Sequence, residues 1–260
     1  MPASSRERPR RDQRTRMLEE PVPRLVLTLA VPTIISMMVT SIYNMADTYF
    51  VSQINTSASG AVGIVFSIMA IIQAVGFTIG MGSGSVASRL LGQGERQRVR
   101  HVSAFCSYCS ILWGVLVAVI MLVFRQPILM LLGARADTMA SATAYYRYLA
   151  LGAPAIIFTL VPSNILRTEG LATAAMVGSV TGALVNIVLD PIFIFLLGMG
   201  AGGAALATVL SNVVSAVLFM ILLCKKSRNL SLHLRECSVH GTELREILLI
   251  GFPASITNLM

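Results

Sequence analysis

The sequence predicts an all-α integral membrane protein: a six-helix transmembrane bundle followed by the start of a seventh helix. Only 12% of the 260 residues are charged and 55% are hydrophobic, whereas soluble domains carry about 25% charged residues. The hydrophobic residues form blocks of about 20, the length at which a helix crosses a hydrocarbon layer. Because lipid cannot satisfy an exposed backbone, such segments must be helical.

The hydrophobic blocks define the domain organisation. A basic, disordered cytoplasmic tail is expected over 1–24, with no apolar segment that would make it a signal peptide. A six-helix lobe follows over 25–224, then a cytoplasmic linker over 225–246 and the truncated start of a second lobe over 247–260. The predicted spans are Leu25–Phe50, Ala61–Leu90, Val102–Phe124, Ala142–Leu166, Thr173–Leu197 and Gly203–Cys224, with a seventh from Ile247.

The basic residues indicate the orientation of the chain. With a cytoplasmic N-terminus, 17 of the 20 Lys and Arg residues fall in the tail and inner loops, and only Arg125, Arg135 and Arg147 lie outside. Inner loops of membrane proteins carry this excess of positive charge. The net charge of +8 therefore predicts a multi-pass protein of the cell (inner) membrane, and no nucleic-acid partner is expected.

A weak internal repeat suggests a second lobe. The segment LTLAVPTIISMM over Leu27–Met38 aligns with LLIGFPASITNL over Leu248–Leu259 when Pro32 is matched to Pro253, at an offset of 221 residues. Parallel repeats of this kind build some transporters, and a second copy would give a twelve-helix protein of about 440 to 460 residues. The alternative is that apolar helix starts containing a proline look alike.

Two acidic residues lie within predicted spans. A carboxylate inside a bilayer costs about 2.5–3.5 kcal/mol, so Asp47 and Asp190 are candidate functional residues. Both fall in the outer half of the membrane, Asn186 shares a helix face with Asp190, and Thr208 lies at a similar depth. These hard oxygen donors suit a proton or a small cation such as Na⁺. Alternatively, Asp47 ends its span in interfacial water, and Asn186 and Asp190 only form hydrogen bonds to neighbouring helices.

Other polar and small residues have simpler interpretations. Gly80, Gly82 and Gly84 resemble a phosphate loop, but no Lys-Ser/Thr follows and close helix packing is expected instead. The C-x-x-C at Cys106 and Cys109 lies inside a span and is expected to pack rather than to act in redox or metal chemistry. Glu169, in a short inner loop, is expected to be solvated. All three histidines lie in inner loops, so no enzymatic catalysis is expected.

From about Leu25 to Met260 the sequence resembles the multidrug and toxic compound extrusion (MATE) family. The resemblance implies two six-helix lobes around a central cleft and an antiporter that exports organic, often cationic, compounds by alternating access. It implies no cofactor; the coupling ion is Na⁺ or H⁺, and the partners are the bilayer, drug-like substrates and the missing second lobe. The motifs are P-x₁₀-Y-N-x-x-D ending at Asp47, A-S-R-L-L-G-Q-G-E over 87–95, N-I-L-R-T-E-G over 164–170 and N-I-V-L-D-P over 186–191.

The resemblance also implies a site. The first helix bends at the position of Pro32, a residue that itself predicts a kink. Tyr43 and Asn44 belong to the same motif as Asp47, whereas Asn164 should lie toward the inner side and support the structure instead. The cation or proton ligands implied are Asp47, Asn186, Asp190, Thr208 and the backbone carbonyl of Ala204.

Two rival functions remain at this point. A lipid-linked oligosaccharide flippase of the same superfamily would need a large cationic cleft, and the predicted spans hold almost no Lys or Arg. A non-transporting membrane scaffold is the other alternative, and it predicts no ion-dependent stability. The absence of a second lobe departs from the family pattern, because one lobe cannot enclose a cleft.

Overall fold

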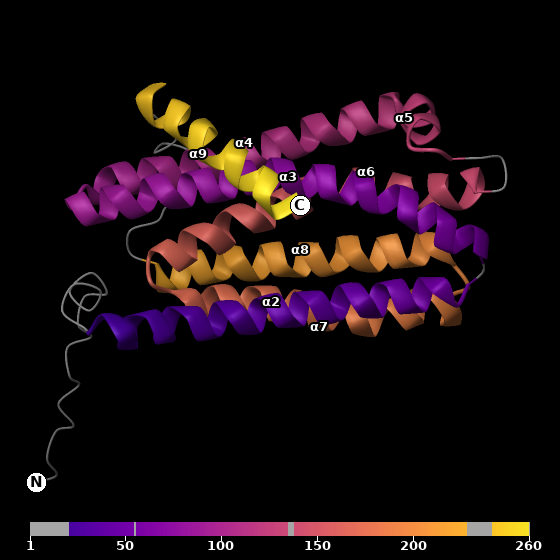
Figure 1. Ribbon diagram of the computed structural model, residues 1–260, viewed down its shortest axis with the longest axis horizontal. Helices are drawn as coiled ribbons and strands as arrows, with labels where there is room; N and C mark the ends of the chain where they lie inside the picture. Colours follow the sequence, from indigo (N-terminus) through magenta and orange to yellow (C-terminus); the bar gives the residue numbers. More distant parts are fainter. Residues whose placement is uncertain (1–20, 55, 135–137, 228–240, 260) are drawn as a thin grey trace, which may run out of the picture.

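The computed structural model describes residues 21–54, 56–134, 138–227 and 241–259. Long helices run side by side along one axis and reverse direction at each connection (Figure 1). The predicted tail lies outside the described residues, apart from its last few. The helices are α2 (Val22–Ser52), α3 (Thr56–Gln93), α4 (Arg96–Val123), α5 (Arg125–Leu131), α6 (Met139–Thr168), α7 (Ala172–Pro191), the π-helical turn η1 (Ile192–Leu196), α8 (Ala201–Lys226) and α9 (Gly241–Leu259).

Six of these helices are long and apolar enough to cross a membrane, namely α2, α3, α4, α6, α7 with η1, and α8. The predicted six-span bundle is therefore confirmed. Two details differ from the prediction. The short helix α5 follows α4, in a segment where the sequence analysis defined no span. Helix α9 begins at Gly241 rather than Ile247, because its first turn is polar and carries Glu243, so hydropathy does not reveal it.

Helices α6 and α2 differ most in burial. Helix α6 packs against α3, α4, α7 and α8, and 72% of its membrane window is buried. Helix α2 packs mainly against α7, with only 6% of its window buried. It continues unbroken through Pro32, and its buried residues are Ser36, Asp47 and Val51. The helix that carries Asp47 is thus attached to the bundle along a narrow seam.

Glycines allow α3 to approach α6 closely. A Cβ on Gly80 would lie 2.8 Å from the carbonyl oxygen of Leu160, and one on Gly84 would lie 3.3 Å from Thr168. Since no larger residue fits at Gly80 without moving the backbone of α6, the predicted packing role of this run is confirmed. Cys106 also packs in a hydrophobic core, as expected.

Two hydrophobic cores fill the bundle. One contains Tyr146, Leu149 and Ile194, and the other contains Val99, Phe219 and Ile247. Buried serine, threonine and asparagine side chains are also present, several of them on α6, α7 and α8. Most of the hydroxyl groups donate to carbonyl oxygens of their own helix, as Thr159 and Ser211 do, which makes them tolerable inside an apolar bundle.

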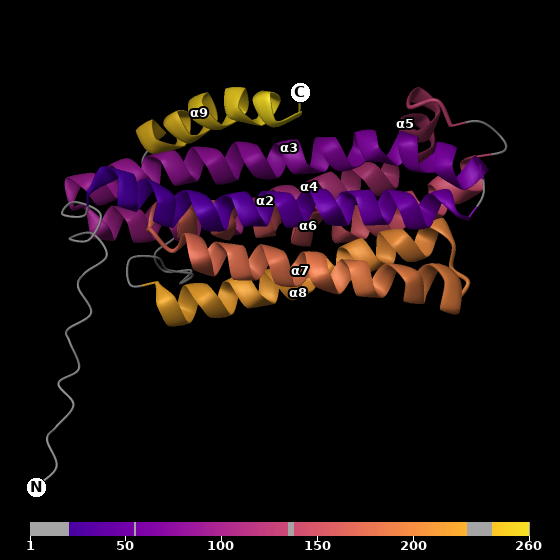
Figure 2. The same cartoon turned by 60° about the horizontal axis from the view of Figure 1, so that its bottom comes forward.

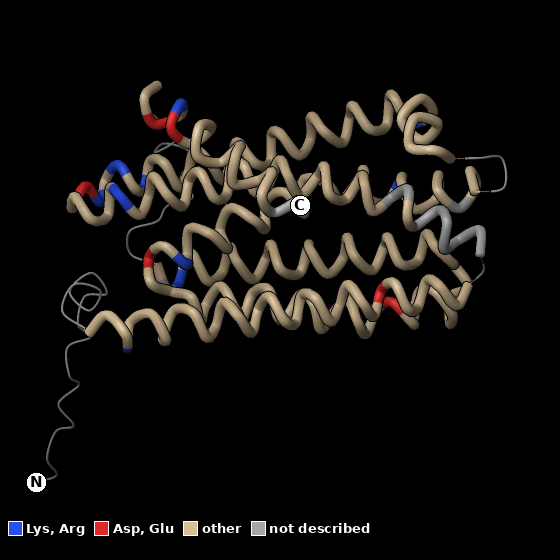
Figure 3. The backbone as a smooth tube through the Cα atoms, viewed as in Figure 1, with Lys and Arg blue, Asp and Glu red and all other residues tan. Residues whose placement is uncertain are grey.

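Charged residues concentrate at one end of the bundle, where α3 ends and α4 and α9 begin (Figure 3). We call this the basic end and define it by Arg89, Arg98 and Glu243. A separate acidic pair lies in the opposite half, on α2 and α7 (Figure 3). Glu169 is only 5% exposed, so the expectation that it would be solvated was wrong. It follows the last residue of α6 directly, and α7 begins three residues later at Ala172.

Candidate functional site

The two acidic residues come from helices that pack against each other. Asp47 lies near the end of α2 and Asp190 near the end of α7. Asp47 is 6% exposed and Asp190 is fully buried. They are close enough to interact electrostatically. The alternative in which Asp47 ends its helix in interfacial water does not hold, because α2 continues to Ser52 and Asp47 faces the bundle.

Asn186 links Asp190 to α8. Its Nδ2 donates to Asp190 Oδ1 at 3.4 Å and to Thr208 Oγ1 at 3.4 Å. If the amide is rotated, Nδ2 lies 3.3 Å from Asp190 Oδ2 and the amide oxygen accepts from the backbone nitrogen of Thr208 at 3.3 Å. In both orientations one buried amide connects the carboxylate on α7 to Thr208. The Thr208 hydroxyl donates in turn to the carbonyl oxygen of Ala204 at 3.1 Å.

Asp47 has an unsatisfied oxygen. Among the described residues, no group forms a hydrogen bond with Asp47 Oδ1, although the atom is buried. Leaving a buried acceptor unsatisfied costs free energy, more so when it is charged. A cavity of about 20 Å³ adjoins Asp47 and Thr208, which is room for one water molecule or small ion. The polar atom and the cavity together fit a monovalent cation or a proton.

Three side chains at this cavity were missed by the sequence analysis. Phe66 and Met69 of α3 and Tyr145 of α6 line it together with Thr208. These residue types are ordinary in apolar spans, so their chemistry carries no signal. Tyr145 could have been identified only by comparing its depth along its helix with the depth of Thr208.

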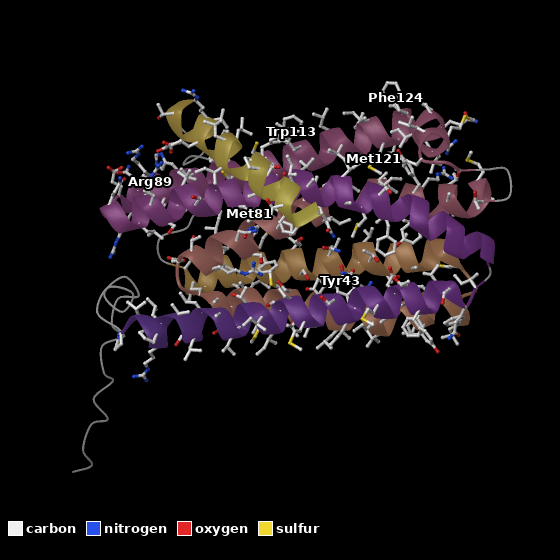
Figure 4. All side chains as sticks on the ribbon, in the orientation of Figure 1. Tyr43, Met81, Arg89, Trp113, Met121 and Phe124 are labelled. Atoms are coloured by element: carbon white, nitrogen blue, oxygen red, sulfur yellow. The ribbon has the colours of Figure 1, made fainter. Side chains whose placement is uncertain are left out.

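The supporting residues from the motifs occupy different places. Tyr43 and Asn44 line the cavity beside Asp47, and Figure 4 labels Tyr43 on α2. Asn164 is not at this site: its Nδ2 donates to the Leu160 carbonyl at 2.7 Å, next to Gly80. The supporting role expected for Asn164 stays a prediction.

A second, larger cavity of about 180 Å³ opens beside the acidic site. The two cavities share Tyr43, Asn44 and Met69. Asn212 connects them further, because its Nδ2 donates to the carbonyl oxygen of Thr208 at 2.8 Å. The lining of the larger cavity is neutral and rich in hydrogen-bonding groups: Thr40, Gln73, Thr159, Ser163, Ser179, Asn186, Ser211, Asn212 and Ser215.

The donor chemistry sets what the acidic site can hold. Within the described ranges, no cluster of three or more His, Cys, Asp or Glu residues is suited to a metal ion. The donors at this site are two carboxylates, an amide, a hydroxyl and a carbonyl oxygen. Such hard oxygen groups suit alkali or alkaline-earth cations and protons rather than thiophilic metals.

These features define the class of the protein: it is a multi-pass helical membrane protein with a buried acidic site inside one six-helix bundle. The MatE family profile matches residues 32–192. The chain therefore belongs to the MatE family, in agreement with the motifs around Asp47 and Asp190. The related proteins found by the comparisons are transporters and not enzymes.

Named relatives and solved structures support this membership. Multidrug export protein MepA of Staphylococcus aureus (strain NCTC 8325 / PS 47) is 31% identical over 243 residues, covering 93% of this chain and 54% of MepA. A multidrug resistance MATE family transporter of the MOP superfamily, solved in an outward-facing conformation, matches with a TM-score of 0.84 at 35% identity, over 90% of this chain and 52% of that one.

A MOP superfamily transporter from Pyrococcus furiosus Vc1 (DSM3638) matches with a TM-score of 0.87 at 34% identity. That alignment covers 94% of this chain and 54% of the solved one. In each comparison the chain spans about half the length of the relative. The match in fold therefore extends over one six-helix lobe and the start of the next helix.

Proposed function

We propose that this chain is the ion-binding lobe of a cation-coupled multidrug efflux antiporter in the cell membrane, with its N-terminus and its basic end in the cytoplasm. The unsatisfied, buried Oδ1 of Asp47 beside a cavity of ionic size is the observation that carries the proposal. A fixed structural network would satisfy this atom internally, whereas an exchange site must leave it for the ion.

The proposed ligands of Na⁺ or H⁺ are Asp47 and Asp190, with Asn186, Thr208 and the carbonyl group of Ala204 completing the site. Among the described residues, no Lys or Arg forms an ion pair with Asp47 or Asp190. Two buried carboxylates without a basic partner repel each other and favour uptake of a cation or proton. The ion thus supplies the positive charge that the protein does not.

The larger cavity is proposed to hold part of the exported compound. Because Tyr43, Asn44 and Met69 line both cavities, a change at one site alters the walls of the other. An ion that enters from outside and draws α2 toward Asp190 would change the larger cavity and lower its affinity for the drug. Such coupling is reciprocal: the drug must weaken ion binding by the same factor.

Helix α2 is the element proposed to move. It is attached to the bundle along a narrow seam and contains Pro32, which leaves one carbonyl of the helix without its usual partner. A bend at Pro32 stays a prediction. Transport by the whole protein requires a second lobe across the cleft, and the repeat at Pro253 is proposed to begin that lobe.

Asp47→Asn and Asp190→Asn variants test the ion site. The thermal stability of the purified protein in detergent should rise in Na⁺ relative to K⁺, or change between two pH values if H⁺ is the ion. At an ion concentration 100 times Kd the gain is about 2.7 kcal/mol. Each variant should lose this response because Asn cannot carry the charge.

Glu95→Gln is the matched control, since Glu95 is an exposed carboxylate at the basic end, and it should keep the full response. Drug efflux from cells that express the full-length, two-lobe protein with each substitution is the second measurement. Ion-driven efflux that is unchanged in both Asp variants would refute the proposed site.

A further inference from the structure

Helix α9 is bound to the bundle through a single stripe of residues. Every fourth residue is buried, and the flanking Leu248, Leu249 and Phe252 are exposed. Its partner in the bundle is α3, and the two helices lie side by side over the half of α3 nearest the basic end (Figure 2). The buried stripe is Glu243, Ile247, Gly251 and Ser255.

The crossing of α3 and α9 is reciprocal and uses one glycine from each helix. A Cβ on Gly82 of α3 would collide with the carbonyl group of Ile247 of α9, and a Cβ on Gly251 of α9 would collide with the carbonyl group of Thr78 of α3. Each glycine thus lets the other helix's backbone come into contact. Such contacts hold helices by close packing rather than by interdigitated side chains.

Ion pairs fix the same contact at the basic end. Arg98 of α4 donates from Nε to Glu243 Oε1 at 2.9 Å, and its second amino group lies 2.6 Å from the same oxygen. The Glu243 side chain is only 5% exposed. Arg89 of α3 pairs with Glu246, and both of these side chains are exposed. Figure 4 shows Arg89 among the polar side chains at this end.

We propose that the α3–α9 contact is a latch that closes the basic end of the transporter and opens once in each transport cycle. The opening motion is the separation of α9 from α3 and α4, which breaks the Arg98–Glu243 and Arg89–Glu246 pairs and parts the glycine crossing. A helix held by one narrow stripe and two ion pairs whose arginines are exposed can separate and re-dock as a unit, whereas α6, buried on most of its surface, cannot.

The latch rests on the proposed transport function, because only a transporter needs to open this end. Its own residues are distinct from the ion site: none of them lines either cavity. The test below therefore uses no drug and no coupling ion. Loss of the ion response in Asp47→Asn would leave its result unaffected.

A reporter cysteine at Ile247 measures the opening. Ile247 is 2% exposed and lies against Gly82, so a cysteine there reacts only when α9 leaves α3. With the four native cysteines replaced, the labelling rate by a membrane-impermeant maleimide is measured in membrane vesicles that expose the basic end. Glu243→Gln with Glu246→Gln should raise this rate at least about fivefold, because the exposed Arg89–Glu246 pair contributes modestly and the loss of Glu243 also leaves Arg98 without its buried partner.

Three further variants separate a latch from general destabilisation. Reversing the pair with Arg98→Glu and Glu243→Arg together should return the rate to within about twofold of the reference, whereas either change alone should raise it. Gly251→Ala should raise it, and Gly241→Ala on the same helix should not, because a Cβ at Gly241 meets nothing within 4 Å. An unchanged rate in the double Gln variant, or equal rates in the two glycine variants, would overturn the latch.

Discussion

Glu243 at the basic end and the pair Asp47 and Asp190 in the opposite half are all buried, but of these three carboxylates only Glu243 forms an ion pair within the described residues. At the basic end, Glu243 on the first turn of α9 is buried and receives two contacts from Arg98. In the opposite half, Asp47 and Asp190 are as deeply buried, and their neighbours in the described part of the chain are a neutral amide, hydroxyl groups and aromatic rings. Within the described residues, the carboxylate of Glu243 is neutralised by Arg98, whereas those of Asp47 and Asp190 form no ion pair.

This difference separates structural from exchangeable charge. A buried ion pair whose partner is fixed to the protein links helices and needs no external ion. A buried carboxylate without such a partner is costly unless it takes up a proton or a cation from outside. Under the proposed function, the carboxylates that exchange an ion are therefore those that have no arginine partner.

The largest expected effect comes from giving the acidic site a basic residue of its own. Met69 lines both cavities, and Lys has a similar length. In Met69→Lys the ammonium group should replace the ion, so the stabilisation by Na⁺ or by protons should disappear completely; a charge pair at 4 Å is worth about 4 kcal/mol at an effective dielectric constant of 20. Thermal unfolding in detergent at two Na⁺ concentrations and two pH values measures this.

Met69→Leu is the control and should respond to the ion as the unmodified protein does. If Met69→Lys keeps the full stabilisation by Na⁺ or protons, the lack of a basic partner is not what makes Asp47 and Asp190 take up an ion.

An intermediate effect is expected when the amide between the carboxylate and α8 is removed. Asn186→Ala deletes the hydrogen bond to Asp190 and the bridge to Thr208. Ion affinity, measured by calorimetry or by titrating the thermal shift, should fall about tenfold, because a hydrogen bond to a charged group contributes about 1.5–3 kcal/mol, partly recovered by water. Ser179→Ala, on the same helix but lining only the larger cavity, should leave ion affinity within about twofold.

The smallest effect is expected at the basic end. Arg89→Gln removes an exposed ion pair, so the free energy of unfolding should fall by less than about 1 kcal/mol. The loss should shrink further as salt is raised, because the Debye length falls from about 10 Å at 0.1 M to 3 Å at 1 M. A double-mutant cycle with Glu246→Gln measures the pair. A coupling that is large and independent of salt would mean that the Arg89–Glu246 pair is desolvated and not exposed.

Sequence reasoning placed Asp47, Asn186, Asp190 and Thr208 at one depth, and the structure does bring them together. The reason is that a straight membrane helix converts residue number directly into depth. The same reasoning missed Tyr145 on α6, because the depth of a residue along a helix does not reveal whether its side chain faces the site. It also treated Glu169 as solvated, because a charged residue between two helices gives no sign that the turn is covered.

The boundaries of α9 show a related limit. Hydropathy located the apolar part from Ile247, but the helix starts at Gly241. The polar first turn is stabilised by Arg98, which lies 145 residues earlier in the chain. No local pattern contains that contact, so neither the start of the helix nor the latch at its base is visible in the sequence.

The sequence by itself determined the membrane class, the six spans, the family and the acidic residues, because hydrophobic length and misplaced charge are local properties of the chain. The tertiary structure decided which carboxylates have a basic partner, where the two cavities meet and how α9 crosses α3. Those features depend on side chains from different helices meeting in space, and helix rotation and close glycine contacts fix them only once the bundle has packed.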